Sequence, residues 1–158
     1  MTVHERPVGA TVEWYTPPEL FRSLGLTFDL DPASPGKEIV PWVPADRHYT
    51  RHDDGLSLPW RGLVWLNPPY GPAGVQFIRR MIEHNDGVML LPARTETRVF
   101  QEALSAAYAT CFLRDRLHFI RDDGLQARSS FASVLFIFGG WLFEPLDDAD
   151  LGVTVLAA

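Results

Sequence analysis

The chain has a single cysteine, Cys111, so no disulfide bond can form within it. This absence excludes the disulfide-rich scaffolds that are typical of small secreted proteins. The N-terminal residues also lack the basic segment and apolar run of a signal sequence. We therefore expect a cytoplasmic protein in which Cys111 is a buried and unreactive thiol.

Long hydrophobic runs are also absent. The longest apolar stretch, residues 131–143, is interrupted by Gly139 and Gly140 and is too short to span a bilayer. Hydrophobic residues make up 46% of the 158 residues and charged residues 22%, as is usual for a globular domain. We predict a single domain over residues 1–158, with residues 1–12 as a loose N-terminal leader and no contact with membranes.

Positive charge is scarce, and lysine is almost missing. The net charge is −6, and 13 of the 14 basic residues are arginine. An acidic chain is a poor match for nucleic acid, because phosphate neutralisation normally supplies most of the affinity. The acidity lies toward the two ends, however, and residues 79–128 carry 8 basic and 7 acidic side chains. Charge alone therefore does not exclude a nucleic-acid partner.

Apolar segments with strand character alternate with amphipathic segments with helix character. We predict strands at 26–31, 62–66, 87–91, 109–114 and 129–139, the last with a weaker pairing partner near 153–156. We predict helices at 73–84 and 95–104, and a short one that Thr16 caps and Gly25 ends. Residues 33–60 are irregular, with short strand-like pieces near 39–43 and 47–50. This order predicts an α/β domain with a mostly parallel sheet flanked by helices.

Three of the predicted strands end on polar or rigid residues. These ends are Asp31-Pro32, Asn67-Pro68-Pro69-Tyr70 and Pro92-Ala93-Arg94. Ligands of open parallel sheets bind at the carboxyl ends of the strands. We expect the three strand ends to line one crevice, which would be the functional site.

The segment NPPY at residues 67–70 is the most specific of these strand ends. The Asn67 side-chain oxygen and the Pro68 carbonyl can both accept hydrogen bonds from one planar NH₂ group. The two prolines fix the backbone, and Tyr70 offers a flat surface for stacking. Base–aromatic stacking contributes roughly 1–3 kcal/mol, which offsets much of the cost of extracting a base from a duplex. The other interpretation is a strand-to-loop corner in which Asn67 is only a cap.

NPPY after a strand resembles the catalytic motif of S-adenosylmethionine-dependent amino-methyltransferases. The surrounding chain looks like the phage-type, Dam-like family of DNA N6-adenine methyltransferases, over about residues 13 to 140. The supporting segments are EWYTPPELF (13–21), FDLDPAS (28–34), DDGLSLPW (53–60), VWLNPPYG (64–71), LLPARTETRVFQ (90–101), FLRDRLHFI (112–120) and SSFASVLFIFG (129–139). The resemblance implies a Rossmann-like methyltransferase domain that methylates the N6 amine of adenine in DNA, and in phage-encoded cases a location in the cytoplasm of the bacterial host.

The resemblance also implies where the cofactor S-adenosyl-L-methionine binds. Trp14, Tyr15, Thr16 and Pro17 would lie against its methionine end. Asp31, Pro32 and Ala33 would occupy the first cofactor-binding strand end, and Asp53 or Asp54 would hold its adenine. The alternatives are that Trp14 and Tyr15 only support the first helix and that the three aspartates are turn residues.

The same resemblance implies the substrate-binding residues. Asn67, Pro68, Pro69 and Tyr70 would bind and orient the target adenine. Arg94, Thr95 and Arg98 would lie near the site, toward the cofactor carboxylate or the DNA backbone, although a surface role suits the arginines equally well. We predict no metal site, because no acid or cysteine completes the pair His48 and His52.

Two departures from the usual pattern limit the assignment. The loop after Asp31 is DPASPG, with only Gly36 where many such domains have a glycine-rich loop. The chain also has no room for a separate target-recognition domain, so base specificity would come from residues 33–60 and 114–128 or from a second subunit of a homodimer. Alternative acceptors are a protein glutamine, an RNA base or cytosine N4, and a further alternative is a non-catalytic nucleic-acid-binding domain.

Overall fold

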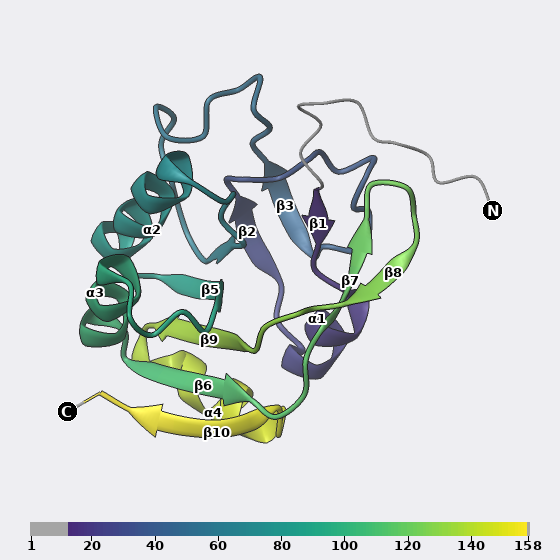
Figure 1. Ribbon diagram of the computed structural model, residues 1–158. Coiled ribbons are helices and arrows are strands. Elements are labelled where there is room, and N and C mark those ends of the chain that lie inside the picture. The colour runs from purple at the N-terminus through teal and green to yellow at the C-terminus, as the bar shows by residue number, and fades with distance from the viewer. Residues whose placement is uncertain (1–12, 158) are drawn as a thin grey trace.

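A computed structural model describes residues 13–157 and shows a mixed α/β architecture (Figure 1). The helices are α1 (Pro18–Leu24), α2 (Pro72–His84), α3 (Arg98–Ala106) and α4 (Phe143–Asp148), with a 3₁₀ turn at Gly140–Leu142. The strands are β1 (Trp14–Tyr15), β2 (Phe28–Asp31), β3 (Ala45–His48), β4 (Val64–Leu66), β5 (Gly87–Pro92), β6 (Ala109–Leu113), β7 (His118–Arg121), β8 (Gln126–Arg128), β9 (Ser133–Phe138) and β10 (Gly152–Leu156). The predicted leader, residues 1–12, lies outside the described residues.

The main sheet has seven strands in the order β10-β6-β9-β5-β4-β2-β3. Its β3-β2-β4-β5 half is parallel, whereas β9 runs antiparallel to both β5 and β6, and β10 runs antiparallel to β6. The predicted mostly parallel sheet is therefore found in one half only. The predicted pairing of residues 153–156 with the strand at 129–139 is wrong, because β5 and β6 already occupy both edges of β9.

The strand order reverses at the boundary between β2 and β4. The chain passes from β2 to β3 on one side, and β4 then lies on the other side of β2. Such a switch point opens a crevice at the carboxyl ends of the strands. The strand ends at Asp31 and Asn67 flank this switch point, and β5 lies beside β4, so the three strands are neighbours in the sheet. That their ends line one crevice stays a prediction.

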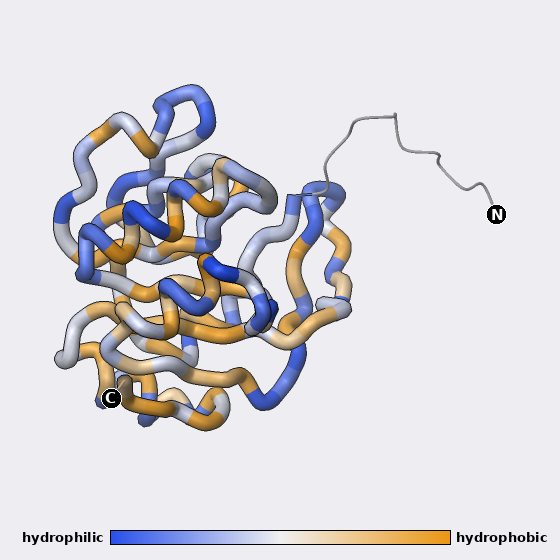
Figure 2. Tube along the Cα trace, turned by 60° about the vertical axis from the view of Figure 1, so that its left-hand side comes forward, coloured by the Kyte–Doolittle hydropathy of each residue, from blue (hydrophilic) through white to orange (hydrophobic). Residues whose placement is uncertain are grey.

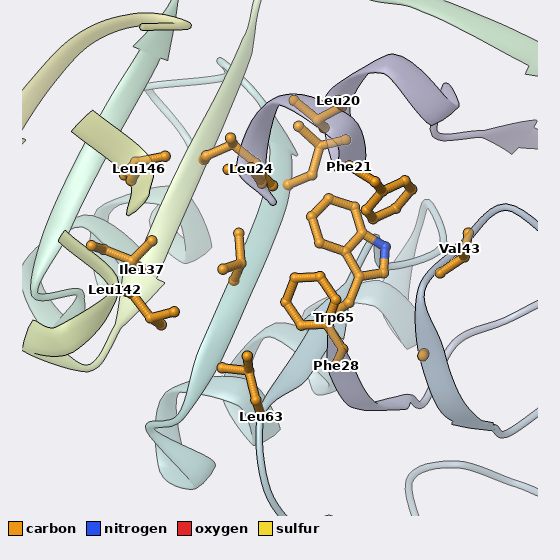
Figure 3. Close-up of a cluster of buried hydrophobic side chains, with 14 of the residues drawn as sticks. Leu20, Phe21, Leu24, Phe28, Val43, Leu63, Trp65, Ile137, Leu142 and Leu146 are labelled. Carbon is orange, nitrogen blue, oxygen red and sulfur yellow. The ribbon is translucent and has the colours of Figure 1, made fainter. Parts of the chain in front are cut away.

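Helices cover both faces of the sheet, and each face has its own apolar core. On one face, α1 and α4 pack on alternate strand residues around Trp65 (Figure 3). The Trp65 ring lies 4.7 Å from that of Phe21 and 5.7 Å from that of Phe28, measured between centroids. On the other face, α2 and α3 contribute Met81 and Phe100. Figure 2 shows hydrophobic segments gathered in the interior and hydrophilic ones in the outer loops. This packing fixes the strand ends that carry the site.

The ends of α1 and α2 follow from local sequence, with one correction. Gly25 ends α1 in the left-handed conformation at φ 62°, as predicted, and Asn85 ends α2 in the same way at φ 55°. The predicted cap by Thr16 is wrong, because Pro17 occupies the N-cap position and no side chain caps α1. The Thr16 hydroxyl instead points toward the site described below.

A second, three-stranded sheet in the order β1-β7-β8 was not predicted. Its first strand pairs Trp14 with Arg121 and Tyr15 with Ile120. Residues 39–43, predicted as strand-like, form turns, whereas the piece near 47–50 overlaps β3. Cys111 is buried in β6, as expected. Among residues 13–157, no helix has the length and apolarity needed to cross a membrane.

Candidate active site

The candidate site begins where β4 ends. The backbone leaves the sheet at Asn67, because Pro68 and Pro69 have no amide hydrogen with which to continue the ladder. The Asn67 amide nitrogen Nδ2 donates a hydrogen bond of 3.1 Å to the Thr16 hydroxyl oxygen. The Asn67 oxygen Oδ1 accepts no hydrogen bond from residues 13–157. The Asn67 side chain is therefore held through its nitrogen, and its oxygen Oδ1 is free to accept a hydrogen bond from a ligand.

A cavity of about 560 Å³ opens beside this corner. Of the predicted target-binding residues, Asn67, Pro68, Pro69, Tyr70 and Arg94 line it. Its other lining residues are mostly apolar and come from α2, β5, α3, β7 and the start of β9. They include Ile78, Phe100, Phe119 and Phe131. An apolar pocket with a few convergent polar groups is typical of a small-molecule or base-binding site.

Tyr70 lies at the edge of the cavity with 60% of its surface exposed. Desolvation raises the pKa of its phenol, and the positive charge of Arg94 opposes this rise. Tyr70 and Arg94 both line the cavity. Arg94 has no acidic partner among residues 13–157. An exposed aromatic ring beside such a cation suits a base and its phosphate.

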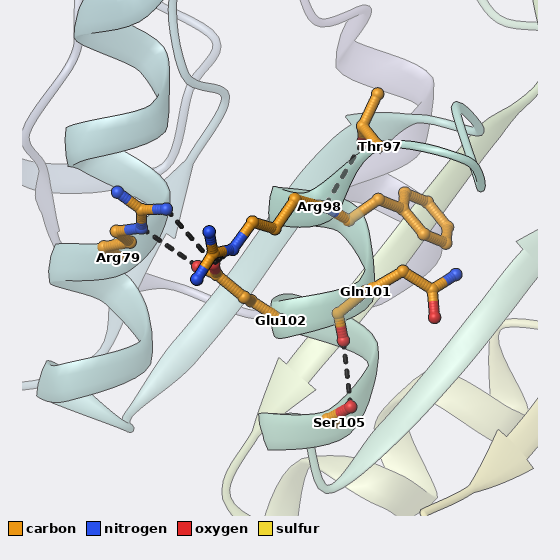
Figure 4. A network of polar contacts seen from close by, with 7 residues as sticks. Arg79, Thr97, Arg98, Gln101, Glu102 and Ser105 are labelled. Atoms are coloured by element: carbon orange, nitrogen blue, oxygen red, sulfur yellow. Dashed lines mark hydrogen bonds and ion pairs between the residues drawn. The ribbon is translucent and has the colours of Figure 1, made fainter.

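Two of the predicted substrate-binding residues, Thr95 and Arg98, lie outside this cavity, and none of the predicted cofactor-binding residues lines it. Arg98, on α3, pairs with Glu102 at 3.2 Å, and Glu102 also accepts from Arg79 of α2 (Figure 4). The backbone carbonyl of Thr95 accepts a hydrogen bond of 2.6 Å from Gln101 Nε2. The adjacent Thr97, which was not predicted, both lines the cavity and caps α3 by accepting from the Phe100 amide.

Asp31 ends β2 as a buried carboxyl group. Its Oδ1 accepts a hydrogen bond of 3.2 Å from the Ala33 amide, which is the only hydrogen bond to this carboxylate from residues 13–157. Burial raises the pKa of Asp31 to about 7, and the hydrogen bond from Ala33 opposes the rise. The second carboxylate oxygen is therefore free to accept a hydrogen bond from a bound ligand.

The loop with Asp53 and Asp54 folds against the segment after Asp31. Gly55 packs so closely on the Pro32 carbonyl that a Cβ atom would overlap it. Asp53 Oδ2 accepts hydrogen bonds from the Thr50 amide at 2.8 Å and the Thr50 hydroxyl at 3.0 Å, and these bonds lower the Asp53 pKa. Asp54 adopts φ 55°. The structure thus brings this loop to Asp31 while one Asp53 oxygen stabilises the loop itself.

The aromatic pair before α1 connects to the cavity indirectly. Trp14 packs edge-on against Phe119, with 6.5 Å between ring centroids, and Phe119 lines the cavity. The Tyr15 hydroxyl donates a hydrogen bond of 2.7 Å to Glu13. Burial, followed by this carboxylate, raises the pKa of Tyr15 well above its usual value.

No group of three or more potential metal ligands occurs within residues 13–157. His48 Nδ1 lies 2.7 Å from the Ser34 hydroxyl and joins the ends of β3 and β2.

Three residues that line the cavity, Phe119, Phe131 and Ser133, were given no role from the sequence. Phe119 lies in a strand too short and polar to be predicted, and only its segment's resemblance to the family drew attention to it.

Comparison with known proteins gives a family for the chain. The comparison with curated proteins found no match, and neither did the comparison with solved structures. The family model described as DNA N-6-adenine-methyltransferase (Dam) matches residues 6–147, which is most of the chain. This match agrees with the resemblance that the motif segments indicated. The chain therefore belongs to the Dam family of DNA N-6-adenine-methyltransferases.

Proposed function

We propose that this chain transfers a methyl group from S-adenosyl-L-methionine directly, in line, to the N6 amine of a specific adenine in DNA. The observation that carries the proposal is the orientation of Asn67, whose amide nitrogen bonds to Thr16 while its oxygen faces no donor among residues 13–157. An acceptor held rigidly at a strand end beside an apolar cavity is suited to an exocyclic amine.

The role of the NPPY corner is to hold and polarise the amine. Asn67 Oδ1 and the Pro68 carbonyl would accept its two N–H hydrogens and direct its lone pair toward the electrophile. These oxygens also stabilise the positive charge that develops on nitrogen as the new N–C bond forms. Tyr70 would stack on the base. The methyl–sulfur bond would break as the N–C bond forms, and the excess proton on nitrogen would then leave to water.

The residues after β2 fit the cofactor by their chemistry. S-adenosyl-L-methionine supplies an electrophilic methyl group on a positively charged sulfonium when it is bound. Asp31 has a free carboxylate oxygen in a buried setting, and the switch point between β2 and β4 is where such sheets bind nucleotides. We propose that Asp31, Pro32, Ala33, the 53–54 loop and the segment 14–17, apart from the Thr16 hydroxyl that bonds Asn67, hold this cofactor in a Rossmann-like domain.

Methyl transfer with a labelled cofactor tests the proposal. Purified protein is incubated with unmethylated DNA, and the DNA is digested to nucleosides. We expect labelled N6-methyladenine from the wild type. We expect a rate roughly 10² to 10³ times lower from Asn67→Ala, because that variant loses the side-chain oxygen that would accept a hydrogen bond from the reacting amine. Tyr70→Ala loses stacking, whereas Tyr108→Ala, another exposed tyrosine, is the matched control.

The same assay separates the competing functions. Label on cytosine, RNA or glutamine, with none on adenine, would move the activity to another planar amine. Cofactor binding without any methylated product would favour a nucleic-acid-binding domain. Wild-type methylation that Asn67→Ala leaves unchanged would contradict the role assigned to the NPPY corner.

A further inference from the structure

We propose that Thr16 is a positioning residue that holds the Asn67 amide in place for methyl transfer. This inference rests on the proposed function and concerns a role beyond contact with the cofactor. Thr16 and Asn67 are far apart in the chain but are joined by the hydrogen bond from Asn67 Nδ2 to the Thr16 hydroxyl, at 3.1 Å. Thr16 is 3% exposed.

Three features of the neighbouring residues hold Thr16 in place. The preceding residues, Trp14 and Tyr15, are paired with β7. The Thr16 carbonyl accepts a hydrogen bond of 2.8 Å from the Trp42 indole nitrogen. Pro17 follows with its backbone fixed at φ −69°. The backbone that carries the Thr16 hydroxyl is thus fixed on both sides, so it would not shift if the Asn67 side chain moved.

The Asn67 amide needs such a hydrogen-bond partner because its two ends are similar in shape. The two ends of an asparagine side chain have nearly the same shape, so packing alone distinguishes them poorly. A half-turn of the Asn67 amide would present NH₂ to the target amine, and two donors would then face each other. In the structure the Thr16 hydroxyl accepts from the nitrogen and leaves Oδ1 for the amine. Because a hydroxyl can also donate, the N–H donors of the target amine make this orientation the favoured one, and Thr16 holds the amide in place in it.

A double-mutant cycle tests whether Thr16 acts through Asn67. Thr16→Val keeps the shape and removes the hydroxyl, whereas Thr16→Ser keeps it. We expect kcat to fall about tenfold in Thr16→Val, the effect of one hydrogen bond, and to stay within about twofold in Thr16→Ser. In the Asn67→Ala background we expect Thr16→Val to have no further effect. Thr110→Val, a buried threonine on β6, is the matched control.

The split between kinetic constants separates this role from cofactor binding. A positioning residue lowers kcat and leaves the KM for S-adenosyl-L-methionine near its wild-type value. A raised cofactor KM with unchanged kcat would overturn the proposal in favour of direct cofactor contact. Additive losses in the double mutant would also overturn it.

A readout independent of activity comes from the side-chain amide itself. The chain has two asparagines, Asn67 and Asn85, so protein labelled with ¹⁵N-asparagine shows two side-chain NH₂ pairs. We expect Thr16→Val to shift the Asn67 pair and speed its hydrogen exchange, with the Asn85 pair unchanged. An unmoved Asn67 pair would overturn the proposal even if methylation is confirmed. A moved pair in a chain without methylation would disprove the proposed function alone.

Discussion

The Trp60 indole nitrogen donates a hydrogen bond of 2.7 Å to the carbonyl oxygen of Gly55. This bond fixes the loop of Asp53 and Asp54 at the point where Gly55 meets the Pro32 carbonyl. The chain lacks a glycine-rich loop after β2. At this strand end a glycine from a later loop, Gly55, instead packs directly on the backbone of Pro32.

Gly55→Ala should destabilise the fold and weaken cofactor binding together. The added Cβ would overlap the backbone of Pro32, which cannot move without displacing the end of β2. We expect a loss of roughly 1–3 kcal/mol in the free energy of unfolding, measured in urea. Gly25→Ala, where the Cβ would meet no other atom, is the control: it should lower stability through its positive φ and leave cofactor affinity unchanged. Normal cofactor affinity in Gly55→Ala would contradict this account.

Asp31→Asn should change how stability depends on pH. The Asp31 pKa is about 7 in the folded protein and near 3.8 when unfolded. Between these values the folded state keeps a proton that the unfolded state releases, so stability is full below about pH 3.8 and falls as pH rises to 7. Asparagine cannot ionise, and the variant should lack this fall. We expect its Tm to gain on the order of 10 °C over the wild type at pH 8, relative to pH 4.

The control for this experiment is Asp46→Asn, an exposed carboxyl group on the neighbouring strand β3. This variant keeps Asp31, so its stability should still fall as the pH rises from 4 to 7. Asp31→Asn should at the same time bind the cofactor more weakly, because it loses a charged acceptor. The same fall in Asp31→Asn would show that this carboxyl group is not the source of the dependence.

Arg94→Ala should weaken DNA binding, whereas Arg98→Ala should not. Arg94 lines the cavity, and Arg98 is held by Glu102 on the outer side of α3. We expect the slope of log affinity against log salt to fall by about one for Arg94→Ala, as for the loss of one phosphate contact. Equal slopes for both variants, measured by fluorescence anisotropy with a labelled duplex, would argue against a phosphate contact by Arg94.

Glu102→Gln should have only a small effect on stability and none on methyl transfer. Glu102 joins α2 to α3 by accepting from Arg79 at 2.9 Å and from Arg98, but both arginine side chains are exposed and that of Glu102 is partly exposed. Exposed ion pairs contribute little, and salt screens them. Urea unfolding should show a small loss at low salt that disappears at high salt. A large loss that persists in high salt would mean that Glu102 has a packing role.

The sequence was most informative where apolar periodicity and rigid residues coincide. The apolar run before Asn67, the prolines after it and the amphipathic segment at 73–84 predicted β4, the strand-end corner and α2 close to their observed bounds. That the strands ending at Asp31 and Asn67 lie side by side agrees with the general geometry of parallel sheets. These features depend on local sequence and on one rule of topology.

Features that depend on distant pairing were not predicted. Two-residue β1 and the short β7 exist because they pair with each other, and neither has a periodic pattern long enough to indicate a strand. Thr16 looked like a helix cap because Thr-Pro-Pro is a common helix start, and only the fold shows its hydroxyl bonded to Asn67. The position of β10 beside β6 likewise depended on the insertion of β9, which no local signal encodes.

The pairing of β1 with β7 has a consequence for the order of events during synthesis. Trp14 is among the first described residues, yet its partner Arg121 belongs to the last third of the chain. The strand that carries Asn67 can therefore emerge from the ribosome and begin to fold well before Thr16 has the support that holds it. A nascent chain that stops short of β7 would therefore contain the NPPY corner but not the strand that supports the segment before Thr16.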